Sequence, residues 1–220
     1  GIAGIATFRS GRIDVGDSLD NLSIGEAAGD SHTTGTRNVA LGLNALTGNT
    51  TGIENTSLGV YSLETNSTGN DNTALGYRAL LANTTASSNT AVGSDALKAN
   101  TTGTLNTAVG YAALDNNSTG DSNTAMGTNA LGVCNADDNT AFGKSALSDS
   151  TTGTQNTAIG ALAADAVTTG NYNTAVGYNA YSAATTGTFN MAFGNQAMGG
   201  GVVTGTRNTA CGNGALYDLT

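Results

Sequence analysis

The side chains able to carry chemistry are few in this sequence, and they are not spaced as a catalytic or metal-binding set. The only histidine, His32, lies in a loop beside Thr33, Thr34 and Gly35, so we expect a solvated turn residue and not a ligand or base. The acidic pair Asp137 and Asp138 occurs once, whereas solenoids that bind calcium repeat their aspartates in every copy. The glycines at 199–201 lack the lysine of a phosphate loop. We therefore predict no enzyme, no cofactor and no metal site.

Composition narrows the class of protein further. The 220 residues include 32 Gly and no Pro, and only 10% are charged, which fits neither a helical protein nor a disordered one. The formal net charge of −9 disfavours binding to the phosphates of nucleic acid. No run of about 18 apolar residues is present, so no membrane insertion is predicted. A chain beginning with Gly1 is expected to be a processed product or a piece of a longer protein.

One short phrase, Asn-Thr-Ala-Val-Gly, recurs along almost the whole chain. It stands complete at 89–93, 106–110 and 173–177, and related versions bring the copies to twelve, spaced seventeen residues apart except for one step of sixteen and one of eighteen. A fixed period of this length is the signature of a repeat architecture. We therefore divide the chain into a leader or cap strand at 1–20, a repeat domain at 21–216 and a tail at 217–220.

The first five positions of each repeat predict a β-strand. Position 1 is Asn in every copy, position 3 is Ala or Ser, and position 4 is always apolar. Because side chains alternate in a strand, positions 2 and 4 share one face and positions 1 and 3 share the other. Stacked copies would join the asparagine amides in a structural ladder, whose members are Asn38, Asn55, Asn72, Asn89, Asn106, Asn123, Asn139, Asn156, Asn173, Asn190 and Asn208, preceded by Asn21.

Position 5 is Gly throughout and predicts a sharp corner, since glycine alone enters unusual backbone regions at little cost. These corner glycines are Gly42, Gly59, Gly76, Gly93, Gly110, Gly127, Gly143, Gly160, Gly177, Gly194 and Gly212. A second short strand is expected around positions 8 and 9, mostly Ala-Leu, followed by an exposed polar loop such as 49–52. The predicted fold class is all-β, a parallel β-solenoid (β-roll) of about twelve 17-residue coils forming a rod roughly 55 Å long.

Apolar residues on both faces of the strands indicate that one chain is not sufficient. A second apolar stripe repeated over twelve coils is too large to leave in water, so we predict an oligomer. Cys134 and Cys211 would lie about 20 Å apart, too far for an intrachain disulfide. Cys211 occupies position 4 and is expected to be a small core residue. Triplets Asn-x-Ser/Thr are attributed to turn composition and not to glycosylation.

The phrase Asn-Thr-Ala-Val-Gly followed by Ala-Leu resembles the head repeats of YadA-like trimeric autotransporter adhesins, and the Thr-Thr-Gly turns are similar to those of bacteriophage tail-fibre repeats. The resemblance covers 21 to about 216. It implies a parallel homotrimer carried on a fibre outside the cell, at a bacterial surface or on a virion tail. The chain departs from these heads in its longer loop, because their repeats are nearer fourteen residues.

The expected function is a non-enzymatic structural or adhesive fibre segment, a rigid rod that presents loops for host or surface attachment. Its partners would be further copies of itself and a cell-surface glycan or protein receptor. Tyr172 and Phe189 precede the repeat Asn and are candidates for stacking on a sugar, the alternative being ordinary packing along the rim. Two alternatives stay open. One is a subunit of an extracellular filament that stacks head to tail; the other is a monomeric ice- or carbohydrate-binding solenoid using its Thr rows.

Overall fold

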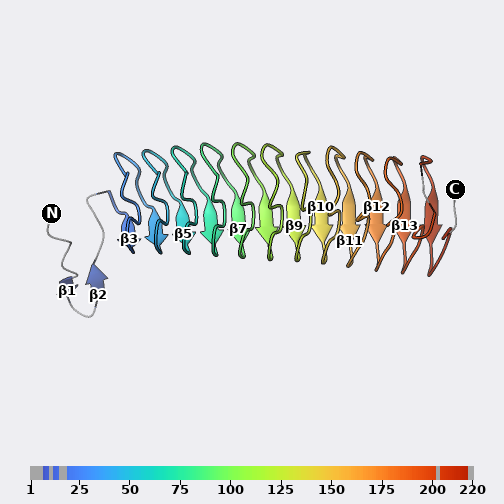
Figure 1. Cartoon of the computed structure of the whole chain (residues 1–220), viewed down its shortest axis with the longest axis horizontal. Coiled ribbons are helices and arrows are strands. Elements are labelled where there is room, and N and C mark those ends of the chain that lie inside the picture. The colour runs from blue at the N-terminus through green and yellow to red at the C-terminus, as the bar shows by residue number, and fades with distance from the viewer. Residues whose placement is uncertain (1–6, 10–11, 15–18, 202–203, 218–220) are drawn as a thin grey trace.

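The computed structural model describes residues 7–9, 12–14, 19–201 and 204–217, and within them the molecule is a straight rod of stacked coils (Figure 1). Twelve parallel strands form one sheet along the rod, each strand hydrogen-bonded to those of the coils before and after it. Each strand pairs with the next without slippage, so every repeat position forms a row along the axis. The parallel β-solenoid predicted from the sequence is confirmed.

Each coil contributes one three-residue strand. In order along the rod they are β3 (Leu22–Ile24), β4 (Val39–Leu41), β5 (Thr56–Leu58), β6 (Thr73–Leu75), β7 (Thr90–Val92), β8 (Thr107–Val109), β9 (Thr124–Met126), β10 (Thr140–Phe142), β11 (Thr157–Ile159), β12 (Thr174–Val176), β13 (Met191–Phe193) and β14 (Thr209–Cys211). No helix occurs in the described ranges, so none is present there that could cross a membrane.

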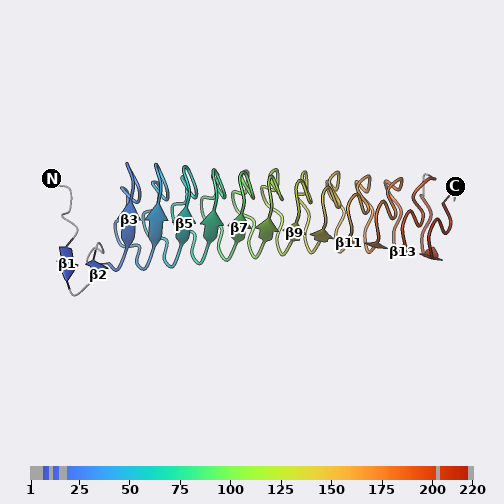
Figure 2. The same cartoon turned by 90° about the horizontal axis from the view of Figure 1, so that it is seen from below.

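The leader forms a small antiparallel hairpin of β1 (Thr7–Arg9) and β2 (Arg12–Asp14), seen at the N-terminal end in Figures 1 and 2. The hairpin does not cap the sheet as expected, because neither of these described strands contacts β3. Ile2, Ile5 and Val15, which belong to the predicted leader or cap strand at 1–20, lie outside the described residues.

The expected second strand of each coil is absent from the described coils: positions 6–11 form hydrogen-bonded turns. The residues at positions 7 and 9 have left-handed backbones, for example Asn44 (φ 53°) and Leu46 (φ 53°). The Asn44 N–H donates to Glu26 O of the preceding coil, whereas the Leu46 N–H donates to Ser62 O of the following coil, both at 3.0 Å. The left-handed backbones therefore direct the N–H groups of positions 7 and 9 towards opposite ends of the rod. Neighbouring coils stay hydrogen-bonded here without a strand.

The narrow interior is filled from three positions. The small residues of positions 3 and 8 and the larger residues of position 9 are buried, as for Ala91, Ala96 and Leu97, all with no exposed surface. Ala96 and Leu97 both point inwards because the left-handed backbone at position 9 (φ 50°) breaks the alternation of an extended strand. Apolar side chains of positions 2 and 4 face outwards instead, so the interior lies on the small-residue side of the strand.

Core volume is balanced between positions 9 and 12 of the same coil. In 156–172, the usual Leu is replaced by Ala164 while position 12 holds Val167; in 173–189, Tyr181 is matched by Ala184. All four side chains are buried to at least 99%. Because protein interiors are close-packed, a small residue at one site is offset by a larger one at the other.

Candidate functional site

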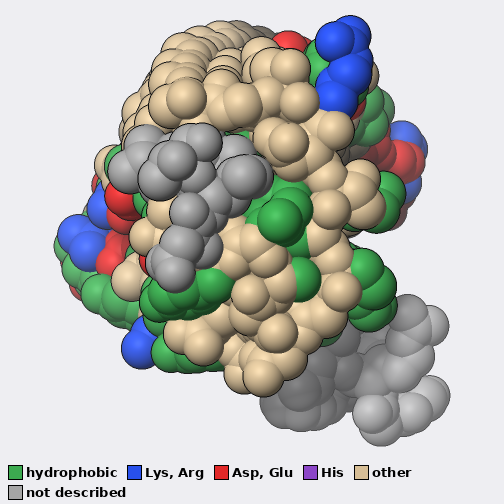
Figure 3. Space-filling model, turned by 90° about the vertical axis from the view of Figure 1, so that its right-hand side faces the viewer, with side chains coloured by type: hydrophobic (Ala, Val, Ile, Leu, Met, Phe, Trp, Pro, Cys, Tyr) green, Lys and Arg blue, Asp and Glu red, His purple; other side chains and the backbone are tan. Residues whose placement is uncertain are grey.

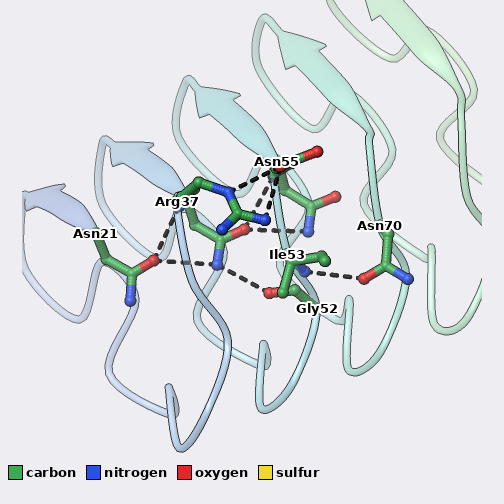
Figure 4. A network of polar contacts seen from close by, with 8 residues as sticks. Asn21, Arg37, Gly52, Ile53, Asn55 and Asn70 are labelled. Carbon is green, nitrogen blue, oxygen red and sulfur yellow. Dashed lines mark hydrogen bonds and ion pairs between the residues drawn. The ribbon is translucent and has the colours of Figure 1, made fainter. Parts of the chain in front are cut away.

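The asparagine of position 1 closes its own coil and bonds to the coil before it (Figure 4). Asn38 Nδ2 donates to Gly52 O at 2.8 Å, at the far end of the same coil, and the Asn38 backbone N–H donates to Asn21 Oδ1 at 2.8 Å. The same two bonds recur in later coils, as in Asn106, whose Nδ2 reaches Gly120 O at 2.8 Å. Asparagine suits this position because one side chain must both accept and donate.

The structure places all the predicted ladder members in this one row. From Asn38 to Asn208, each backbone N–H donates to the Oδ1 of the preceding ladder residue at 2.8–3.1 Å. Asn208 is part-buried at the C-terminal coil, whereas those from Asn38 to Asn190 are at most 2% exposed. The bond that closes each coil was not anticipated from the sequence.

A second row of asparagines lies inside the loop that the sequence predicted to be exposed. Its members, at position 12, are Asn49, Asn66, Asn83, Asn100 and Asn117, all without exposed surface. Each Nδ2 from Asn66 onwards donates to the preceding Oδ1 at 2.7–3.1 Å. Glycosylation at these asparagines is therefore incompatible with the folded coil. Within 49–52 and the equivalent loops of these coils, the exposed position is 14, which is occupied by residues such as Thr102. The recurrence of Asn at position 12 was the available signal.

The corner glycines have a backbone that other residues rarely adopt. From Gly25 to Gly212 their φ angles lie between +130° and +146°. A Cβ placed on Gly110 would lie 2.7 Å from both the carbonyl carbon and oxygen of Gly127 in the next coil. Glycine is required at this position for two reasons, the backbone angle and the close approach of successive coils.

We define the strand face as the outward side chains of positions 2 and 4 in strands β3–β14. Eight of its apolar side chains are 37–56% exposed: Ile24, Leu58, Leu75, Met126, Phe142, Ile159, Met191 and Phe193. Cys211 is also exposed there, so its assignment to the core is wrong. The single chain leaves uncovered a face that the sequence indicated should be buried. Figure 3, which looks along the rod, shows hydrophobic side chains on its outer surface.

Tyr172 and Phe189 form an exposed stack at position 17. Their ring centroids are 4.7 Å apart with an interplanar angle of 3°, and each residue is 49% exposed. The Arg207 guanidinium lies 5.5 Å from the Phe189 centroid. Tyr172 and Arg207 both pack against the Phe189 ring, while each of the two aromatic residues keeps about half of its surface exposed.

Charged side chains pair between coils on other sides of the rod. Arg37 contacts Glu54 at 2.7 Å in the position 17 row, and Arg78 donates two hydrogen bonds to Asp95 at 2.8 and 3.0 Å. The Glu54 carboxylate, through a hydrogen bond, raises the pKa of the exposed Asp71. The Arg37–Glu54 pair is exposed and contributes little stability. The Arg78–Asp95 pair is part-buried, because Asp95 is only 8% exposed.

The residues considered first for chemistry are dispersed. His32 is half-buried in the first coil and is therefore less solvated than expected, while Asp137 and Asp138 are exposed. Asp137 Oδ1 accepts the Asp121 backbone N–H at 2.8 Å, a structural role between coils. Within the described residues no three His, Cys, Asp or Glu side chains are grouped as a metal site would need.

Tyr181 carries an ionisable hydroxyl in the interior of the rod. Its hydroxyl accepts a hydrogen bond from Asn190 Nδ2 at 2.6 Å, and burial raises the pKa of Tyr181 to about 12. An unfolded tyrosine has a pKa near 10, so between about pH 10 and 12 the unfolded chain releases a proton that the folded chain keeps. We expect the free energy of unfolding to fall as the pH rises through this window.

The measurement is urea unfolding at pH 9, 10 and 11 for the wild type, Tyr181→Phe and Tyr178→Phe. Tyr178 is 54% exposed and serves as the control. Tyr181→Phe should flatten the alkaline loss of stability and Tyr178→Phe should not. An equal slope in all three proteins would contradict the role assigned to Tyr181.

Together these features define a parallel β-solenoid, a repeat protein whose coils are joined by a strand, hydrogen-bonded turns and an asparagine ladder. The chain matches no family model, no curated protein and no solved structure at a significant level.

Proposed function

We propose that this chain is a structural and adhesive fibre segment: a rigid rod that assembles as a parallel trimer and presents its loops for attachment. The observation that carries the proposal is the combination of coil-to-coil bonding through all twelve coils with an outward apolar face of the same length. The bonding between coils makes the rod rigid. The apolar face is a surface of the kind that proteins usually bury against a partner.

A structural rod also accounts for the chemistry that the molecule does have. Its buried polar side chains, such as Asn89 and Asn100, hold the coils together. Both have no exposed surface, and each of their hydrogen bonds goes to the same coil or to a neighbouring one. The exposed loop residues, among them Thr102 and Thr119, repeat along one edge and are the side chains available to a receptor. On this proposal the rod works outside the cell, at a bacterial surface or a virion tail.

One observation favours the second candidate, a monomeric solenoid that binds ice or carbohydrate. Position 2 accepts Leu22, Val39 and Met191 as well as Thr, and its side chains face outwards in the single chain. Eight successive strands, β5–β12, place Thr at this position. A regular row of hydroxyls on a flat sheet is suited to an ordered ligand, and it requires the face to remain free.

The mass of the purified chain in solution, measured by light scattering beside electron micrographs of the same sample, tests the proposal. A discrete mass near three chains, seen as short rods, is the expected result. Long filaments would instead favour head-to-tail stacking. A stable single chain would overturn the trimer and direct attention to ice and glycan binding.

A further inference from the structure

We infer that copies of this chain associate sideways through the strand face, in parallel and with like coils at the same level. This inference rests on the proposed trimeric rod and deepens it, because it names the side of the rod that lies against the other copies. The occupant of the strand face is then a second copy of the same chain.

The first argument is charge. In all twelve strands, positions 2 and 4 hold only Thr or apolar residues, so the strand face has no charged side chain although the chain has a formal net charge of −9. Two copies meeting through the sides that carry charged residues, such as the position 17 row, would bring acidic groups together, and like-charge contacts disfavour association. Identical acidic chains can approach through the strand face without that cost.

The second argument is the size of the face. Eleven steps of about 4.8 Å and a strand width of roughly 10–15 Å give on the order of 500–800 Å² for one chain. A stable protein–protein interface buries about 800 Å² on each partner. The upper end of this estimate reaches that size, and side chains such as Phe142 (53% exposed) and Phe193 (56%) give the strand face the polarity expected of an interface core.

The other sides of the rod are less suitable. The position 17 row contains Arg37, Glu54 and Asp71, and its one strongly exposed aliphatic residue is Leu105 at 62%. The loop edge is lined by Thr and Ser, whose position 13 hydroxyls already donate to carbonyls of the next coil, as Thr50 does to Ser67 O at 3.0 Å. The position 17 row is interrupted by charges, and the loop edge, although uncharged, is polar, so neither side offers an apolar surface of comparable length.

The first test places charge on the strand face. Leu75, Val109 and Phe142 lie at position 4 of alternate coils, so a triple Lys variant adds positive charge without placing two lysines in adjacent coils. The matched control changes Ser88, Ser122 and Gln155 to Lys in the same three coils, at position 17. That position tolerates long cationic side chains on a left-handed backbone, since Arg37 and Arg207 have φ angles of 58° and 61° there.

We expect the strand-face variant to sediment as a single chain under conditions where the wild type and the control remain assembled. Burying like charges on the order of three per copy should raise the dissociation constant by about 1,000-fold or more. Circular dichroism of each variant checks that the β-structure is retained. A strand-face variant that stays folded and assembled would overturn the inference and leave the trimeric rod standing, whereas a monomeric wild type would overturn both.

The second test uses the native chain and reports the direction of packing. Cys211 is exposed at position 4 of β14, whereas Cys134 is buried. In a parallel assembly Cys211 thiols of two copies lie at one level, so oxidation by diamide should join them in a disulfide, with two electrons and two protons passing to the diamide. The control is Cys211→Ser, which should give no covalent dimer.

An antiparallel pair would place Cys211 opposite Ile24 at the other end of the strand face. Covalent dimers would then appear only in the Ile24→Cys variant, between that residue and Cys211. This result would retain the strand face as the contact surface but overturn the parallel register and, with it, the trimeric rod. Dimers of the unmodified chain through Cys211 support both.

Discussion

Replacing Asn106 by Asp is expected to destabilise the rod by about 3–5 kcal/mol at neutral pH, since it puts an uncompensated charge into a buried polar network. Asn106 has no exposed surface. Its Nδ2 donates to Gly120 O at 2.8 Å and its Oδ1 accepts the Asn123 N–H at 2.9 Å. A carboxylate keeps the second bond and loses the first, so the Gly120 carbonyl faces a negative oxygen where it had a donor.

The effect should depend on pH in a defined direction. The buried carboxyl should have a raised pKa, and protonation restores a donor towards Gly120, so the destabilisation should shrink as the pH falls towards 4. Urea unfolding at pH 7 and pH 4, at fixed chain concentration, measures it. Asn129→Asp is the control, because Asn129 is exposed at position 7, where Asp95 stands in another coil. Equal stability of the two variants at pH 7 would contradict the ladder.

The second large effect is expected from Gly110→Ala. Gly110 has φ +136°, and an added Cβ would lie 2.7 Å from backbone atoms of Gly127, which cannot move without shifting the next coil. Backbone strain and overpacking each cost about 1–3 kcal/mol, so the variant should lose several kcal/mol.

Gly132→Ala is the matched control in a neighbouring coil. Its Cβ would meet no atom among the described residues closer than 3.6 Å, and its φ is not in the left-handed range. We expect the thermal midpoint of Gly132→Ala to stay near that of the wild type and that of Gly110→Ala to drop by many degrees. A similar midpoint for both variants would show that the corner does not require glycine.

The solenoid could be predicted because its two strongest signals, Asn at position 1 and Gly at position 5, each have a definite physical reason to recur. The turn at positions 6–11 could not. Its left-handed positions are filled mostly by ordinary side chains, including Leu97 (φ 50°), and glycine marks them only in the end coils, at Gly29 and Gly214. A buried Ala-Leu pair has the same sequence whether it lies in such a turn or in a strand, which is why a second strand was expected.

The outer side of the strand posed a different difficulty. Apolar residues at position 4 indicate burial, and the sequence does not say whether the interior of the coil or a neighbouring molecule buries them. The prediction that Cys211 lies in the core followed from that ambiguity. The hydrogen bond from Asn38 to Gly52 closes the coil, so the side of the strand that carries the asparagine ladder faces the interior. Position 4 lies on the opposite side and therefore faces outwards.

The uneven distribution of the second asparagine row has a consequence for cooperativity. Each coil interacts only with its two neighbours, so folding can be described as propagation along a one-dimensional array. Coils from Asn49 to Asn117 are coupled by two rows of asparagine amides. In the later coils position 12 is no longer Asn, and only the position 1 ladder remains; the residues there are Cys134, Ser150, Val167 and Ala184. The coupling between coils therefore falls after Asn117, and partial unfolding should spread more readily through the C-terminal half, leaving a folded N-terminal block as a discrete intermediate.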